Sequence, residues 1–499
     1  MLGNNPEKVL PKRRRGRKQT TAGAPGAETS LFPGRSGLPV TSSWSTAVLV
    51  ATGGSLMVVV SLGAMSAELG NVSIWVWILT AAVGGAQCLL VAELASRFPE
   101  RAGGTAQFAY RVRAKGSPTM GALSAWCYWF AWTPGIAVNL ILAATFLRDR
   151  WLPGVSPVLL AFAIAAVLYF ITAMGLKLST VINAVLAVVA VGVVLIVVLS
   201  PVARPHAGDL SRVFPSVLPS DAGHLSLGAQ LALIAKWSFV ATWSSYAAEM
   251  ASTVCAEIRN PEGTMKRVMS TSAIICFVAF AAVPIAMFAL SGADGVQADP
   301  FEVFANAGHV LLGDAGELFV QLGLTAVLIL GAETFIIGSS RTIYQMARDG
   351  HLPAAFGKIN KRGAPVGSIA WDAVVIGLLL VVFGTNVVDV VAAANFGYMA
   401  VFVLLPIAYL VLRKHPAGRP GSLRLGRYAR PLAVLLCAIN LIFLVYGGAQ
   451  WGGSVMLIGL CVTLVIIPIS YFTRRWNAKH PAVPNSVPVA VPQPEVERA

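Results

Sequence analysis

Long runs of apolar residues alternate with short polar segments over most of this 499-residue chain. A helix that crosses a lipid bilayer needs about 20 consecutive, mostly apolar residues. Runs of this kind predict about twelve membrane-spanning helices, which we number 1 to 12, at 46–68, 74–97, 121–146, 155–174, 179–200, 229–257, 268–291, 317–347, 366–385, 389–412, 431–449 and 453–473. The pattern therefore predicts an all-α integral membrane protein.

The composition agrees with a membrane protein. Charged residues make up 12% of the chain and hydrophobic residues 56%, with a mean hydropathy of +0.72. A soluble protein carries about 25% charged residues. Because so few charges cannot cover a surface that faces water, the composition argues against a large soluble enzyme. The lipid bilayer is the expected surroundings of most of the chain.

The basic residues predict the orientation of the chain in the membrane. The first tail contains R-R-R-G-R-K at 13–18, which places it in the cytoplasm, and twelve spans return the second tail to the same side. The chain has 37 Lys and Arg residues. Lys236 alone lies inside a span, and four residues fall on the side opposite the tails, namely Arg148, Arg150, Arg204 and Arg212. The remaining 32 fall on the same side as the tails. The net charge of +15 therefore reflects topology, and we expect no nucleic-acid partner. The expected location is the plasma membrane, with both termini cytoplasmic.

The polar segments outside the spans divide the chain into regions. Residues 1–44 are basic and rich in Pro and Gly, and residues 474–499 are rich in Pro and Val, so both are expected to be disordered cytoplasmic tails. Residues 45–412 contain predicted spans 1 to 10, and residues 413–473 contain a loop and predicted spans 11 and 12. We expect no second folded domain, because no polar segment is long enough to form one.

Sequence motifs for enzyme chemistry are missing. The chain has no G-x-x-x-x-G-K-[ST] phosphate loop and no H-E-x-x-H zinc motif. Its six cysteines all lie in predicted spans, without C-x-x-C spacing, as small packing residues do. We therefore expect no enzymatic activity, no cofactor and no structural metal.

A few polar side chains lie inside the apolar spans. Such groups are costly in lipid, so they usually face a bundle interior or a water-filled cavity. They are Glu68, Asn139, Lys236, Glu249, Glu333 and Asn395. Glu68 is expected at the outer interface, and Lys236 is close enough to the outer end of span 6 to extend toward it. Glu249 lies near the middle of its span and cannot reach an interface.

Two predicted spans contain sequences that weaken a helix. Span 1 contains Gly53-Gly54, and span 6 contains W-S-S-Y-A-A-E at 243–249. Two weak helices five spans apart indicate an inverted repeat with its binding site at the breaks. A broken helix offers free N–H groups to a carboxylate and free C=O groups to an ammonium. The alternative is that the glycines only let two helices pack closely.

Three longer stretches carry a family resemblance. They are A-E-L-A-S-R-F-P-E-R-A-G-G-T-A-Q-F-A-Y at 92–110, A-E-I-R-N-P-E-G-T-M-K-R-V at 256–268, and the segment from S-S-R-T-I-Y-Q-M-A-R-D-G-H to K-R-G-A-P at 339–365. In order and spacing they resemble the amino acid permeases of the amino acid–polyamine–organocation (APC) superfamily. The resemblance implies a five-plus-five inverted repeat, about 46–200 and 229–412, with two additional helices. It also implies secondary transport or exchange of an amino acid or related amine.

The resemblance also implies a set of site residues. Substrate would bind at Thr52, Gly53, Gly54, Ser55, Met57, Trp132, Trp243, Ser244, Tyr246 and Ala247. Trp243 and Glu249 match a tryptophan and a glutamate of the arginine/agmatine antiporter branch, where the first covers the substrate and the second assists pH-linked release. Glu249 is therefore a candidate for coupling, with Lys236 and Glu333 as candidate coupling or gating residues that could pair with each other. The alternative is that Glu249 is merely paired with Lys236 or a hydroxyl group.

The chain departs from the family pattern at two places that bear on the mechanism. The usual G-S-G of span 1 aligns with Ser55-Leu56-Met57, so Gly53-Gly54-Ser55 would have to take its role. Proton-coupled members carry a lysine in span 5 where this chain has Ala190. Coupling to protons, coupling to sodium, exchange without an ion, and a substrate sensor on the same fold all remain open.

Other polar residues are weaker candidates. A sodium site could use Ser339 and Ser340 of span 8, although two hydroxyl groups alone are thin support. Arg341 and Arg348 are expected to anchor the cytoplasmic end of that span. Asn395 could face the cavity or join two helices, and Trp132 is a better candidate than Trp126 for lining the site.

Overall fold

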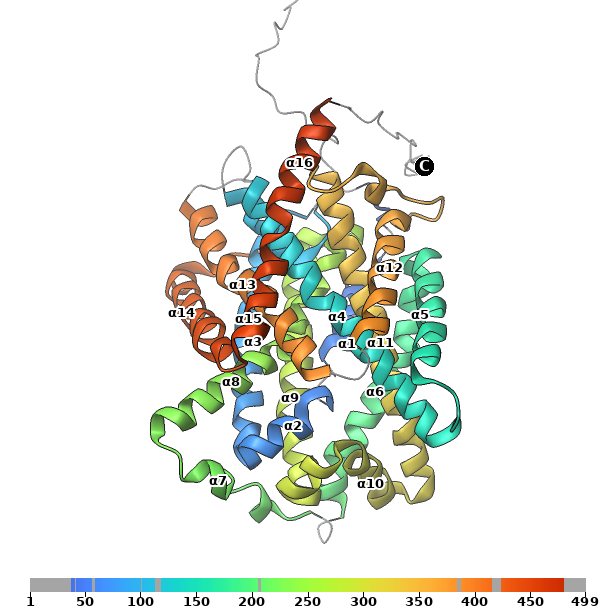
Figure 1. The fold of residues 1–499 in the computed structure, drawn as a ribbon, viewed down its shortest axis with the longest axis vertical. Helices are drawn as coiled ribbons and strands as arrows, with labels where there is room; N and C mark the ends of the chain where they lie inside the picture. The colour runs from blue at the N-terminus through green and yellow to red at the C-terminus, as the bar shows by residue number, and fades with distance from the viewer. Residues whose placement is uncertain are drawn as a thin grey trace, which may run out of the picture.

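The computed structural model describes residues 37–40, 42–55, 59–99, 101–112, 118–204, 208–383, 387–414 and 423–479. Every regular element within these ranges is helical, and one isolated β-bridge joins Ser42 to Ile258. Most of the long helices run roughly along the long axis of the molecule (Figure 1). The predicted all-α class is confirmed.

The helices carry the labels of Figure 1. They are α1 (Trp44–Ser55), α2 (Val59–Leu69), α3 (Ser73–Arg97), α4 (Pro118–Trp151), α5 (Pro157–Ala173), α6 (Leu176–Ala203), α7 (Ser220–Gly223), α8 (Leu227–Ser245), α9 (Pro261–Ala298), α10 (Pro300–Leu312), α11 (Asp314–Arg348), α12 (Val366–Phe383), α13 (Val387–Lys414), α14 (Ala429–Ile442), α15 (Gly453–Leu464) and α16 (Ile466–Lys479). Two 3-10 helices, η2 (Gly104–Val112) and η4 (Ala247–Glu257), contribute to the site described below. A π-helical segment, η7 (Phe443–Gly447), continues α14.

Many of these helices are suited to a membrane. Eight stretches are long and apolar enough to cross one, and they are Ser61–Arg97, Pro118–Trp151, Leu176–Ala203, Pro261–Ala298, Asp314–Arg348, Val391–Lys414, Gly426–Gly447 and Gly453–Lys479. Two shorter apolar helices lie at Pro157–Ala173 and Val366–Val382. On α6, Val185 and Val188 are 63% and 74% exposed, which suits contact with lipid. The chain is a multi-pass membrane protein.

Predicted span 6 changes its helix type near its middle, and predicted span 1 is described on either side of residues 56–58. Span 1 consists of α1, which ends at Ser55, and α2, which begins at Val59. The weak point predicted at Gly53-Gly54 is wrong, because α1 continues as a helix through both glycines. Gly53 instead lies against α11, where an added Cβ would stand 2.2 Å from Thr334 Oγ1 and 2.8 Å from the carbonyl oxygen of Leu330. At Gly53 the close-packing alternative is therefore correct.

Span 6 changes its winding without becoming irregular. α8 ends at Ser245, and the chain continues as the 3-10 helix η4 over eleven residues. Such helices rarely exceed three or four residues, because their hydrogen bonds are poorly aligned. The sequence predicts a loosened helix here, and the structure has a 3-10 helix instead. A 3-10 helix is wound more tightly than an α-helix, and its backbone groups still bond along the chain.

Helix pairs from the two halves of the chain form the centre of the bundle. α3 packs along α9, and α4 packs along α11. Trp77 of α3 stacks on Phe280 of α9, with ring centroids 5.2 Å apart. α1 and η4 both pack against α9 and α11, so these pairs hold the two segments in place.

Ion pairs and backbone bonds hold the predicted cytoplasmic end together. Arg341 of α11 lies 2.9 Å from Glu257 at the end of η4, and both side chains are 1% exposed. Arg101 pairs with Asp349 just beyond α11. The expected role of Arg341 as an anchor thus has a specific partner, the carboxylate of Glu257.

Structured residues extend beyond the predicted limits of the core at both ends of the described chain. Ser42, which we assigned to the disordered segment 1–44, accepts a hydrogen bond from Arg259 N–H at 2.8 Å and donates to Glu257 O at 3.0 Å. Leu38 is buried as well. α16 extends to Lys479, beyond the predicted start of the second tail at residue 474. Residues 1–36 and 480–499 lie outside the described residues.

The contact at Gly53 predicts a local cost for a larger side chain. Gly53→Ala should lower the free energy of unfolding by about 1–3 kcal/mol, because the new Cβ has no room beside Thr334. Gly85→Ala on α3 is the matched control, since its nearest neighbour would be 3.7 Å away. Thermal unfolding of both purified variants measures the difference, and equal stability would contradict the close-packing role.

The buried ion pair predicts a larger loss. Arg341→Met should destabilise the protein by about 3–5 kcal/mol, because it leaves the carboxylate of Glu257 buried and unpaired. Adding Glu257→Gln should recover much of that loss. Arg148→Met, which removes an exposed pair with Asp149, should change stability little. Melting temperatures that fail to rank the three variants in this order would contradict this role for the pair.

Candidate functional site

The candidate site surrounds the junction between α8 and η4. Tyr246 joins the two helices with φ −87° and ψ −7°, and the residues from Trp243 to Met250 are all buried. Serine and alanine fill this stretch, and serine hydroxyls compete for backbone partners, as that of Ser244 does by donating to Ala241 O at 3.4 Å. The sequence therefore permits a change of helix type at this point.

Glu249 is completely buried in η4, and hydroxyl groups from three other elements surround it. Tyr128 of α4 donates to Oε1 at 2.7 Å, and Tyr398 of α13 donates to the same oxygen at 3.3 Å. Thr105 of η2 donates to Oε2. Of the two alternative partners, the structure shows hydroxyls and not Lys236. Hydroxyl donors stabilise a carboxylate without neutralising it, and each can also accept a hydrogen bond from the protonated acid.

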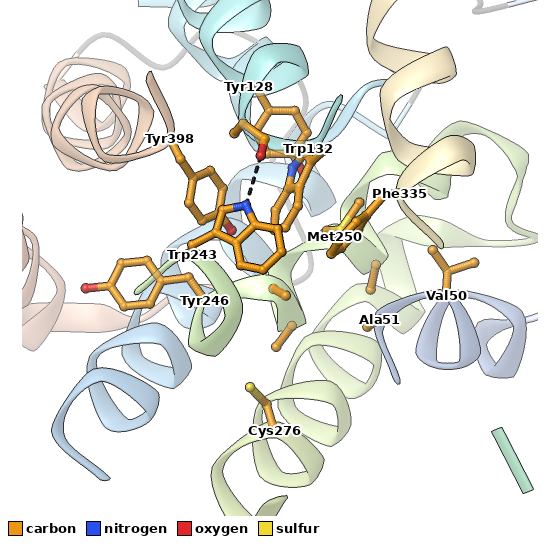
Figure 2. Close-up of a cluster of buried hydrophobic side chains, with 14 of the residues drawn as sticks. Val50, Ala51, Tyr128, Trp132, Trp243, Tyr246, Met250, Cys276, Phe335 and Tyr398 are labelled. Atoms are coloured by element: carbon orange, nitrogen blue, oxygen red, sulfur yellow. Dashed lines mark hydrogen bonds between the residues drawn. The ribbon is translucent and has the colours of Figure 1, made fainter. Parts of the chain in front are cut away.

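Four aromatic rings cover the junction (Figure 2). Trp132 of α4 lies 4.7 Å from Phe335 of α11 and 4.6 Å from Tyr398, measured between ring centroids. Trp243 lies 6.2 Å from Trp132 and donates from its indole N–H to Ala131 O at 2.9 Å. The rings form an apolar wall beside the Glu249 network.

Trp132 and Trp126 of α4 have different surroundings. Trp132 belongs to this wall, whereas Trp126 donates to Val462 O of α15 at 2.8 Å. The two residues are six apart along the helix, so they point to different neighbours. This placement supports the preference for Trp132 as the residue that lines the site.

α1 faces the junction from the opposite side. Val50 and Ala51 lie near Met250 of η4 in Figure 2, and α1 packs against η4. Met57 lies outside the described residues, and so do the side-chain surroundings of Thr52, Gly54 and Ser55. Of the substrate-binding candidates from span 1, only the surroundings of Gly53 are described, and it contacts α11.

The remaining candidates of span 6 are divided between the junction and its surroundings. Ala247 is buried at the start of η4. The side chain of Tyr246 turns away from the aromatic wall, and its hydroxyl donates to Asn440 Oδ1 of α14 at 2.9 Å. Only the backbone of Tyr246 is therefore available at the junction.

Lys236 and Glu333, which could have paired, do not meet in the structure. Lys236 Nζ lies 2.7 Å from Glu68 Oε1 on α2, with the rings of Trp237 and Trp451 beside it. Glu333 instead accepts a hydrogen bond from Thr172 of α5 at 3.0 Å. Lys236 lies on α8 and faces α2, whereas Glu333 lies on α11 and faces α5. Glu68 is thus ion-paired and not a free carboxylate at the interface.

The other polar candidates have intramolecular partners. Asn395 donates to Phe239 O and to Thr242 Oγ1, so it joins α13 to α8. Ser339 donates to Asp372 of α12, and Ser340 donates to Ile336 O at 2.6 Å. These bonds explain the serines of α11 without a sodium ion.

One group of metal-binding residue types occurs in the described part of the chain, at the surface near the start of α11. It consists of His309, Asp314 and Glu317. Glu317 already lies 3.4 Å from Arg150, and His309 lies 3.3 Å from Asp314. Ordinary surface ion pairs account for this group.

Comparison with known proteins agrees with this arrangement. A family model described as amino acid permease matches residues 42–450. The D-serine/D-alanine/glycine transporter of Escherichia coli (strain K12) is 25% identical over 344 residues, covering 66% of this chain and 71% of that protein. The branched-chain amino acid permease BcaP of Bacillus subtilis (strain 168) is 26% identical over 337 residues, covering 64% of each.

A further relative is the uncharacterized amino acid permease YvbW of Bacillus subtilis (strain 168), which is 26% identical over 307 residues, or 59% of this chain and 67% of that protein. The family match extends over most of the described helices, including α1, α2, α8 and η4. The chain belongs to the amino acid permeases of the APC superfamily.

Proposed function

We propose that this protein is a secondary active transporter that moves an amino acid or related amine across the plasma membrane by alternating access. The observation that carries the proposal is the buried Glu249, held by three hydroxyls where α8 changes into η4. A carboxyl in this position can load and release a proton as the surrounding helices move. We propose proton coupling through this group.

A five-plus-five inverted repeat, about residues 46–200 and 229–412, is part of the proposal. Helix contacts support it. In such a repeat, helices in equivalent positions of the two halves meet across the pseudo-twofold axis. α3 and α9 are equivalent in this scheme, and so are α4 and α11, and both pairs pack closely. α6 and α13 are also equivalent. The repeat therefore predicts that if α6 packs against α11, α13 packs against α4, and both contacts are present.

The elements after the repeat complete the proposed topology. Residues 413–473 would form a loop and two additional helices, and both tails, 1–44 and 474–499, would be cytoplasmic. The distribution of Lys and Arg supports this orientation. Leu38, near one described end, packs with Tyr344 of α11, and Ser470 of α16, near the other, lies 3.0 Å from His351 just beyond α11.

Substrate would bind between η4 and α1, beside the junction of α8 and η4. Backbone N–H and C=O groups at helix ends there would receive its carboxylate and ammonium groups. The wall formed by Trp132, Trp243 and Phe335 is apolar, which favours a substrate with a small neutral side chain. Two relatives are named for neutral amino acids, and this supports the same substrate class.

Proton coupling through span 5 has less support. Ala190 stands where proton-coupled members carry a lysine, and it is buried in an apolar cluster with Ala187, Val327 and Leu330. That position offers no titratable group. Glu249 is therefore the proposed carrier at the substrate site. An exchanger without ion coupling and a sensor that binds without transport are the competing functions.

Replacing Glu249 tests the coupling. Uptake of labelled neutral amino acids into proteoliposomes should follow an imposed proton gradient, and Glu249→Gln should abolish this dependence while substrate binding persists. Glu302→Gln, on the exposed side of α10, is the charge-matched control and should behave as the unmodified protein does. If Glu249→Gln kept the full gradient dependence, the carboxyl would have only a structural role.

The same assay separates the competing functions. Flux that appears only when unlabelled substrate is present inside the vesicles would indicate an exchanger. Binding without flux under any gradient would indicate a sensor.

Two tryptophans of α4 provide a test of the substrate site. Trp132→Phe should raise KM for uptake about tenfold, since loss of a well-packed ring contact corresponds to roughly 1.4 kcal/mol. Trp126→Phe should leave KM unchanged, because Trp126 contacts α15 and not the junction. Uptake kinetics at fixed pH measure both values, and equal effects would place the substrate elsewhere.

A further inference from the structure

A second buried carboxyl lies outside the Glu249 network. Glu333 of α11 is 0% exposed, and its Oε1 accepts a hydrogen bond from Thr172 of α5 at 3.0 Å. Its other oxygen, Oε2, has no hydrogen-bond partner in the part of the chain that the structure describes. Thr334, the next residue, is also buried with its hydroxyl group unpartnered there. Such groups are costly in a protein interior unless they bind something.

α6 brings further polar groups to the same level of the membrane. α6 and α11 run antiparallel, because Val193 lies against Gly323 while Ala187 and Ala190 pack with Val327 and Leu330. The same register places Asn183 opposite Glu333. Ser179, one turn earlier on α6, also faces this carboxyl.

The amide of Asn183 strengthens the case for a ligand. Asn183 is completely buried, and neither its Oδ1 nor its Nδ2 has a partner within the described residues. Hydroxyls and an amide can donate to a carboxylate or accept from a carboxylic acid. The groups around Glu333 can therefore satisfy it in either protonation state.

No basic side chain forms an ion pair with Glu333 in the described part of the chain, and the one that attracts it electrostatically is Arg341. Arg341, two turns farther along α11, is held by Glu257 at 2.9 Å. Two other titratable groups lie near Glu333, namely Tyr169 of α5 and Asp372 of α12. Tyr169 interacts electrostatically with both Glu333 and Asp372. The faces of α6 and α1 that pack here carry none, and Tyr128 of α4 is bound to Glu249. An unpaired carboxylate inside a membrane protein is costly, and a proton removes that cost.

Asp372 differs from Glu333 in its surroundings. The indole N–H of Trp129 donates to Oδ1 at 2.6 Å, and Ser339 donates to Oδ2, so both oxygens have fixed donors. Such an acceptor suits a constant charge state. Glu333, with one free oxygen and adaptable neighbours, suits a change of protonation.

We propose that Glu333 is a second proton-binding site, formed by α5, α6 and α11 and separate from the site at Glu249. Its use in transport rests on the function proposed above, whereas proton binding itself does not. The contact of Gly53 with Thr334 links the site to α1. A movement of α1 against α11 would change the surroundings of Glu333, which would couple its proton to alternating access.

Infrared difference spectroscopy on the purified full-length protein in lipid tests the site without transport. Across a pH titration, the C=O stretching band of protonated carboxyls should contain a component that titrates. That component should persist in Glu249→Gln and disappear in Glu333→Gln. Glu333→Asp should retain a titrating band, which guards against a Glu333→Gln variant that folds poorly.

Three outcomes would overturn the proposal. Titration in Glu333→Gln identical to that of the unmodified protein would show that Glu333 binds no exchangeable proton. A protonated-carboxyl band that is constant over all pH values in the unmodified protein and is lost in Glu333→Gln would identify a permanently neutral structural acid. A carboxylate band at Glu333 that responds to NaCl and not to pH would identify a metal-cation site.

Transport stoichiometry tests the coupling separately. The number of protons moved per substrate, obtained from reversal potentials in proteoliposomes, should fall by one in Glu333→Gln with Glu249 intact. An unchanged number would overturn the coupling role. Complete absence of flux in the unmodified protein would contradict the proposed function, while the infrared result would still decide whether Glu333 binds a proton.

Discussion

The placement of one carboxyl group at the centre of an apolar bundle constrains much of this structure. Glu249 is fully buried, so it needs hydrogen-bond donors. Thr105, Tyr128 and Tyr398 provide them from η2, α4 and α13. These elements must therefore converge on η4, and any rearrangement of one of them changes the hydrogen bonds of the carboxyl. A shift of helix position and a change of protonation are thus physically linked.

The winding of span 6 serves the same arrangement. A 3-10 helix rises about 2.0 Å per residue, compared with 1.5 Å in an α-helix, so η4 spans a greater distance with fewer residues. Side chains three apart also align along one face of such a helix. The weaker hydrogen bonds of η4 make its packing against α1 and α9 important for its stability. This segment can therefore rearrange more easily than an α-helix of the same length.

The partners of buried carboxyl groups differ between the ends of the bundle and its middle. Near the two ends, carboxylates are paired with basic side chains, as in Glu257 with Arg341 and Glu68 with Lys236. Deeper in the bundle, Glu249 and Glu333 have only uncharged donors among the described residues. Ion pairs fix the ends of helices against one another, whereas uncharged donors allow a carboxyl to gain or lose a proton. The distribution is consistent with rigid ends and a titratable centre.

The sequence by itself determined the helical class, the approximate helix limits and the burial of Glu249, because apolar run length and an isolated charge are local properties. The aligned motifs also identified the family. The partners of Glu249 and Glu333 required the tertiary structure. Thr105 lies in the polar segment between predicted spans 2 and 3, and Tyr128 lies in an aromatic run. Neither position shows a pattern that points to a carboxyl more than 100 residues away.

The same reasoning explains the predictions that failed. Gly53-Gly54 has the local signature of a weak helix, but the space that α11 occupies beside Gly53 decides its role. Lys236 and Glu333 have opposite charges and could have paired, yet helix rotation directs one to Glu68 and the other to Thr172. Side-chain direction around a helix axis depends on which helices are neighbours. That choice is made by packing over the whole chain and is not encoded in any short segment.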